Sequence, residues 1–372
     1  MTTRFGYDLR ENHLDGLRGW AAIFVLVSHL RPLLPENFKI PRIFFADGML
    51  AVSIFFVLSG YVLSIGFYRN TSKRRVIDLA VRRYPRLAIP VLFSCLLTYA
   101  LLNLNAFYNI EAAKITGNKD WLPVFFHFTT SITEVFRYSL YEIFIDPLAT
   151  PSFNPVLWTM SFELAGSFIV LGILLLCGKN KYAQLTVPAI FLAVATIYES
   201  HFSGFAYGMI IAQLTAKSHS NWNKGRIVNT LLIVALTLAL YVASKRELAD
   251  NALLLPVCAA ICVFCIHFCQ VLRSFFSMKI STWLGALSFP IYLTHILVLF
   301  SISSWFIVKA NEFNISPEIT ATSTILISVF CSTLVAIAFK PIESTAIKLS
   351  RKISKTILYA RSSNPLEKVN DA

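Results

Sequence analysis

The sequence predicts an all-α polytopic membrane protein with about ten transmembrane helices and both termini in the cytoplasm. The 372 residues are 56% hydrophobic and only 14% charged, whereas a typical soluble domain carries about 25% charged residues. The mean hydropathy is +0.63, and long apolar runs recur along the whole chain. These observations favour a chain that crosses the membrane many times over a soluble fold.

Ten apolar runs approach the length needed to cross about 30 Å of hydrocarbon. The first run follows a polar lead segment without a small-residue cleavage site, so we expect no cleaved signal peptide and a retained first helix. Two neighbouring runs near the middle of the chain are short and could form a bent pair or a re-entrant hairpin. The ten runs are 17–35, 49–67, 88–106, 155–177, 184–199, 203–216, 228–244, 252–271, 284–308 and 321–339.

The distribution of positive charge predicts the orientation. When the N-terminus is placed inside, most of the 33 Lys and Arg residues fall on the inner segments. The positive-inside rule then places both termini in the cytoplasm. We expect a multi-pass protein of the cytoplasmic (inner or plasma) membrane. The formal net charge of +13 therefore requires no nucleic-acid partner, and the sequence indicates no particular oligomeric state.

We expect one membrane domain, residues 1–342, followed by a basic cytoplasmic tail, residues 343–372. Residues 343–358 place apolar side chains on one helical face and Lys and Arg on the others, which is typical of an amphipathic helix on anionic lipid. The last dozen residues are expected to be disordered. Four cysteines between Cys258 and Cys269 resemble an iron–sulfur spacing, but they recur on one apolar helical face, so we expect core packing without metal or disulfide.

Polar side chains at membrane depth are costly and usually face a cavity or a partner. In the first span, Arg18 and His29 would lie within about 20° of one helical face and about 16 Å apart along the axis. A cation at one membrane surface and an imidazole well inside would form two ends of one site.

Two later spans carry further polar residues. Glu163 lies too deep in the fourth span to be simply solvated, and a histidine on a facing helix would be a suitable partner. In the ninth span Ser288, Tyr292 and His295 recur at i, i+4 and i+7. Each could bond to backbone, but three on one face favour the lining of a cavity, with His295 near mid-depth.

Arginines at the inner surface are candidates for phosphate binding. Arg82, Arg83 and Arg86 immediately precede the third span, and Arg83 with Arg86 would form a compact cationic fork. Guanidinium groups bind phosphate bidentately, although ordinary positive-inside anchoring would also explain them. Ser59 and Gly60 in the second span would permit close approach of either a neighbouring helix or a ligand chain.

Five stretches together resemble the acyltransferase 3 family of integral-membrane O-acyltransferases. The resemblance extends over roughly residues 12–343, with two departures: Ser53 stands where members often have Asp, and the customary terminal Glu-Pro reads FKPIES. The five stretches are LDGLRG with Arg18 and His29, FFVLSGYVL, RRYPRLAIP, LWTMSFE and LSFPIYLTH.

The resemblance implies transfer of an acyl group, commonly acetyl from acetyl-CoA, to a hydroxyl of a carbohydrate, glycolipid or related acceptor. It implies that Arg18 and His29 are essential, with His29 catalytic, and that the fork and the Ser-Gly segment serve acyl-CoA. No metal is expected. His29 could act as general base or as acyl carrier, with Glu163 or Tyr292 orienting it.

A different class of protein also fits the polar residues. In a transporter or flippase, the intramembrane His, Glu and Arg would be relay or substrate contacts. The chain shows no obvious duplicated half, which favours the enzyme, and a structural scaffold explains the polar stripes poorly.

Overall fold

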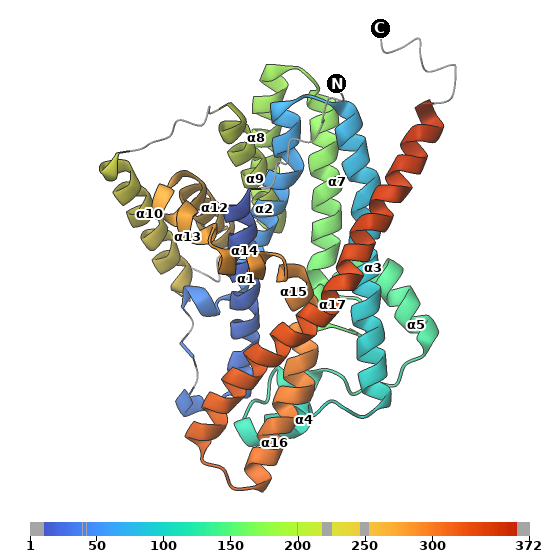
Figure 1. Ribbon diagram of the computed structural model, residues 1–372, viewed down its shortest axis with the longest axis vertical. Helices are drawn as coiled ribbons and strands as arrows, with labels where there is room; N and C mark the ends of the chain where they lie inside the picture. Colours follow the sequence, from blue (N-terminus) through green and yellow to red (C-terminus); the bar gives the residue numbers. More distant parts are fainter. Residues whose placement is uncertain are drawn as a thin grey trace.

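A computed structural model describes residues 11–38, 40–41, 43–198, 200–217, 225–245 and 253–362. The described chain is a bundle of helices (Figure 1), and π-helical turns join α5 to α6 and α15 to α16. The helices are α1 (Asn12–Leu30), α2 (Gly48–Arg69), α3 (Lys73–Asn103), α4 (Asn109–Thr116), α5 (Ile132–Arg137), α6 (Ile143–Ile145), α7 (Thr159–Cys177), α8 (Lys181–Tyr198), α9 (Ser200–Lys217), α10 (Arg226–Ser244), α12 (Leu254–Phe268), α13 (Gln270–Phe276), α14 (Lys279–Gly285), α15 (Ser288–Val298), α16 (Ser304–Glu312) and α17 (Pro317–Ser362).

The structure confirms a polytopic helical membrane protein. Among the described residues, seven helical segments are long and apolar enough to cross a membrane, or eight if α12 and α13, bent by 94°, form one broken span. Every one of the ten expected runs lies on helix. Two of these runs, on α1 and α9, are not apolar enough to be counted among the membrane-crossing helices. The total of ten spans therefore stays a prediction.

Polar residues account for the lower apolarity of α1 and α9. The first carries Asp15, Arg18 and His29, and the second carries His201 and Gln213. The short runs 184–199 and 203–216 form α8 and α9, two separate helices that pack against each other. Both α1 and α9 also pack against α2. In the apolar stretch of α2, 89% of the residues are buried inside the protein. The polar groups of α1 and α9 therefore lie next to protein.

Glycines determine how closely α2 approaches α9. A Cβ on Gly60 would lie 2.2 Å from the carbonyl oxygen of Phe205, and one on Gly208 would lie 2.1 Å from that of Val57. Any side chain at these positions would push the helices apart. Gly60 thus serves helix packing against α9, and its expected contact with acyl-CoA stays a prediction.

We expect Gly60→Ala to destabilise the protein by about 1–3 kcal/mol, the usual cost of overpacking. The matched control is Gly172→Ala in α7, where a Cβ would meet nothing within 4 Å and should stabilise the helix by about 0.5–1 kcal/mol. Thermal unfolding in detergent measures both. Equal midpoints for the two variants would contradict the close α2–α9 contact.

One end of the bundle gathers the start of α1, the turn between α2 and α3, and the end of α17. Arg69 donates to Glu11, just before α1, at 3.0 Å. Ser354 of α17 donates to Asp78 of α3 at 2.6 Å. At the opposite end α16 packs on α4, which belongs to the segment that joins α3 to α7 (Figure 1).

The last helix is longer than expected. α17 continues through Pro341 to Ser362, so the expected tail helix, residues 343–358, extends the last span and packs along α3. Its contact with lipid stays a prediction, and most of the last dozen residues, expected to be disordered, lie outside the described residues. The cysteines Cys258, Cys262 and Cys265 are buried along α12, which confirms their predicted packing role.

Candidate active site

His29 and His295 form a direct pair between α1 and α15. His29 Nδ1 and His295 Nε2 are 3.1 Å apart. His295 is completely buried, whereas His29 is partly exposed. The structure therefore brings together two of the predicted site residues, and His29 is the more exposed of the two.

The hydrogen bonds assign the tautomers of both rings. His295 Nδ1 lies 2.9 Å from the carbonyl oxygen of Ile291, which can only accept, so this nitrogen carries the proton. In the neutral ring, His295 Nε2 is then an acceptor for His29 Nδ1–H. The remaining nitrogen of neutral His29, Nε2, consequently holds a free lone pair and can accept a proton.

An aromatic wall fixes the orientation of the His29 ring. Trp121 stacks on it at 5.4 Å between ring centroids with an interplanar angle of 20°. Phe300, from the π-helical turn after α15, meets Trp121 edge-on at 5.1 Å. Sequence reasoning missed Trp121, because it lies in the connection between α3 and α7 and no local pattern links it to α1.

Tyr292 does not orient His29, contrary to expectation. Its hydroxyl donates to the carbonyl oxygen of Val156 and lies 2.6 Å from the hydroxyl of Thr159. Tyr292 thus ties α15 to the start of α7. Ser288 also bonds to backbone, at the carbonyl oxygen of Gly285. Of the predicted polar stripe, only His295 therefore bonds to the candidate catalytic residue.

Glu163 is paired with an arginine, so its expected histidine partner is wrong. Arg83 forms an ion pair with Glu163 and also donates to Ser167 at 2.7 Å and Ser59 at 2.9 Å. Ser59 in turn donates to Glu163 at 2.5 Å. This network joins α2, α3 and α7, which explains why a carboxylate can lie at this depth.

The three arginines before the third span do not all bind in the same way, because two of them form ion pairs with carboxylates and Arg86 does not. Arg83 is committed to Glu163, and Arg82 forms an i,i+4 ion pair with Asp78 at 2.9 Å. Within the part of the chain that the structure describes, Arg86 makes no hydrogen bond or ion pair. Of the three arginines, Arg86 is therefore the one that is not held by a carboxylate in an ion pair.

Arg18 and Arg86 share one electrostatic environment. Arg86 interacts with the charge of Arg18, and both interact with the charge of Arg83 and with the carboxylate of Glu343. Arg18 also lies 3.6 Å from Asp15. Because α1 is one continuous helix from Asn12 to Leu30, Arg18 lies about 16 Å along it from His29. The helix therefore carries a cationic region at one level and the histidine pair at another.

Comparison with known proteins decides the family. A family model described as an acyltransferase domain, acyltransferase 3, matches residues 11–340. The chain belongs to the acyltransferase 3 family. It is therefore grouped with acyltransferases, and the matched range includes every residue of the site described above except Glu343.

One similar protein comes from Bacillus subtilis (strain 168) and is named "Putative peptidoglycan O-acetyltransferase YrhL". It is 25% identical over 324 residues, which are 76% of this chain and 47% of the relative. The chain thus spans about half the length of the curated relative it matches. No solved structure matches the chain.

Proposed function

We propose that this acyltransferase 3 protein is an O-acetyltransferase that moves an acetyl group from cytoplasmic acetyl-CoA to a carbohydrate hydroxyl on the extracytoplasmic side. The observation that carries the proposal is the His29–His295 pair, which leaves a basic nitrogen on a partly exposed ring. The name of the Bacillus relative supports a glycan acceptor. The positive-inside distribution of charge supports a cytoplasmic side for the donor.

The proposed chemistry needs one base at His29. Nε2 takes the proton of the acceptor hydroxyl as the oxygen attacks the acyl carbonyl carbon. The carbon–sulfur bond of the thioester then breaks, and the proton passes from His29 to the leaving CoA thiolate. His295 Nε2 accepts from His29 Nδ1–H throughout, which holds the ring in the required tautomer and stabilises the transient imidazolium.

Arg86 and Arg18 are proposed to hold the CoA phosphates. Both are cationic, and Arg86 interacts with the charge of Arg18, so the two guanidinium groups attract phosphate, while the nearby carboxylate of Glu343 offsets part of their charge. The pantetheine arm would reach from this region toward His29, about 16 Å along α1. This arrangement places the donor thioester beside the histidine while the nucleotide stays at the cytoplasmic end.

We expect Arg86→Ala to raise the donor KM about 10-fold or more, the loss of one charge-assisted phosphate contact. The acceptor KM should change little, because the acceptor would bind at the His29 end. The measurement is initial rate against acetyl-CoA concentration in membranes. Lys73→Ala, which removes an exposed charge from the start of the same helix, is the control. A donor KM that matches the control would contradict the phosphate contact.

Radiolabelled acetyl-CoA tests the reaction class. Label that appears on glycan as an alkali-labile ester supports O-acetyl transfer. Movement of a solute across the membrane without ester formation would instead indicate a transporter. Under the general-base route the protein itself should remain unlabelled when acceptor is withheld, whereas an acyl carrier would retain label on His29.

A further inference from the structure

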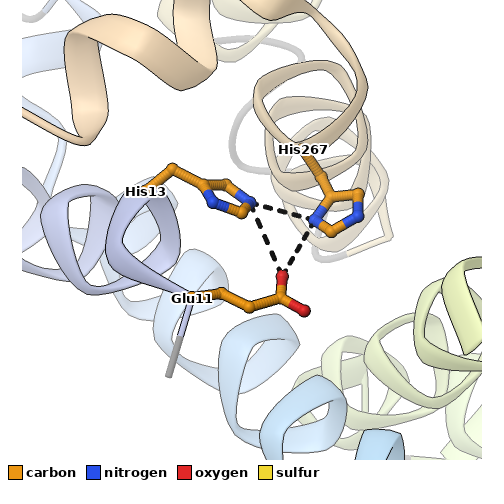
Figure 2. A group of neighbouring side chains, drawn as sticks. All are labelled: Glu11, His13 and His267. Carbon is orange, nitrogen blue, oxygen red and sulfur yellow. Dashed lines mark hydrogen bonds and ion pairs between the residues drawn. The ribbon is translucent and has the colours of Figure 1, made fainter. Parts of the chain in front are cut away.

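Three potential metal ligands meet away from the candidate active site, at the start of α1. Glu11 immediately precedes α1, His13 lies in its first turn, and His267 lies in the last turn of α12. Figure 2 shows the three side chains pointing toward one another, with dashed lines joining all three pairs. Their ligand atoms all lie within 4.8 Å of one another, and His13 is only 2% exposed.

We infer that Glu11, His13 and His267 form a site for a divalent metal ion of the zinc type. The separations are 3.0 Å for His13 Nε2 to His267 Nδ1, 3.3 Å for His267 Nδ1 to Glu11 Oε2, and 3.7 Å for His13 Nε2 to Glu11 Oε2. Tetrahedral zinc with bonds of about 2.0–2.1 Å separates its ligands by about 3.3 Å. A point about 2 Å from all three atoms therefore exists between these side chains without movement of any of them.

Protons on neutral imidazoles satisfy this triangle poorly, whereas a protonated His267 would donate Nδ1–H to the carboxylate. With both rings neutral, a proton on His13 Nε2 leaves the lone pair of His267 Nδ1 facing the carboxylate. A proton on His267 Nδ1 leaves His13 Nε2 facing the carboxylate as a second acceptor. One cation accepts a lone pair from all three atoms at once. Two imidazoles and one carboxylate are also a frequent zinc ligand set, with a fourth position for water.

Neighbouring residues hydrogen-bond the carboxylate of Glu11 and hold it in place, as the residues around a metal ligand commonly do. The Tyr61 hydroxyl lies 3.1 Å from both oxygens of Glu11, and Arg69 donates to Oε1 at 3.0 Å. Glu11 thus faces Arg69 with Oε1 and the two histidines with Oε2. Hydrogen bonds of this kind orient ligating carboxylates in metal sites. The metal would fasten α1 to α12 directly and to α2 through Tyr61 and Arg69.

The proposed site differs from the sequence expectation, which included no metal. Glu11 and His13 form a short E-x-H segment, and only the fold brings His267 to it. The proposed site lies at the Arg18 end of α1, so it would fix the position of the helix that carries both Arg18 and His29. The inference does not depend on the transferase activity.

Zinc content tests the inference. The full-length protein, purified in detergent with a tag that contains no histidine, is stripped with a chelator, titrated with Zn²⁺, and freed of excess metal before elemental analysis. We expect about one zinc per chain, and at least a 10-fold lower content in His13→Ala and His267→Ala. His127→Ala, an exposed histidine outside the cluster, should keep the wild-type content.

A second measurement keeps the test valid if the alanine variants fail to fold. Glu11→Gln keeps the shape of the side chain, and we expect it to fold and to weaken zinc binding at least 10-fold. Zn²⁺ should raise the thermal midpoint of the wild type and leave that of Glu11→Gln nearly unchanged. A wild type without zinc and without a thermal shift, or variants that bind zinc equally well, would overturn the site.

Discussion

Replacing His29 with alanine is expected to lower kcat for acetyl transfer by about 10²–10⁴-fold, the usual contribution of a positioned general base. The reason is the free Nε2 lone pair that the His295 hydrogen bond leaves on His29. Initial rates of labelled ester formation in membranes, normalised to the amount of folded protein, measure the effect. The donor KM should change much less, because the proposed phosphate contacts lie at the other end of α1.

His127→Ala is the matched control for this loss. His127 is exposed and lies in the same connection as Trp121, so its removal should leave kcat within a few-fold of wild type. If His29→Ala keeps the kcat of this control while it is folded and expressed equally, then His29 is not the base.

Removing Arg83 is expected to destabilise the protein by about 3–5 kcal/mol, because Glu163 is left as an unpaired charge. The side chains of Arg83 and Glu163 are only 10% and 16% exposed. Arg83→Met keeps most of the volume and removes the charge. The midpoint of thermal unfolding in detergent should fall clearly, whereas Arg82→Met, which breaks the more exposed pair with Asp78, should cost about 0–1 kcal/mol.

The double variant Arg83→Met with Glu163→Leu separates charge from packing. It removes both members of the pair, so no uncompensated charge remains, and much of the lost stability should return. Two independent losses that simply add would show that the two side chains do not interact in the folded protein.

Much of the fold can be predicted from local sequence patterns, because each apolar run becomes a helix whatever its neighbours are. Apolar runs predict helices because an unpaired backbone cannot lie in lipid, and every expected run is indeed helical. No helix ends at the predicted boundary between membrane domain and tail, residue 342, because α17 continues through Pro341. A proline there leaves the chain helical in the structure, which hydropathy alone does not reveal.

The site is only partly predictable because its contacts join distant segments. The i,i+4,i+7 pattern identifies His295, and the helix geometry of the first span identifies His29. It takes the fold to show that these two bond to each other and that Glu163 bonds to Arg83. Trp121 and the cluster of Glu11, His13 and His267 depend on the same kind of long-range contact.

The stoichiometry of acetyl transfer tests the central claim most directly. Membrane vesicles that contain the protein and native envelope glycan receive labelled acetyl-CoA, and free CoA thiol and alkali-labile label on carbohydrate are counted together. We expect one labelled ester for each CoA thiol released. In His29→Ala, both ester formation and thiol release should be lost. Glycan without ester label, or equal ester formation in wild type and His29→Ala, would contradict it.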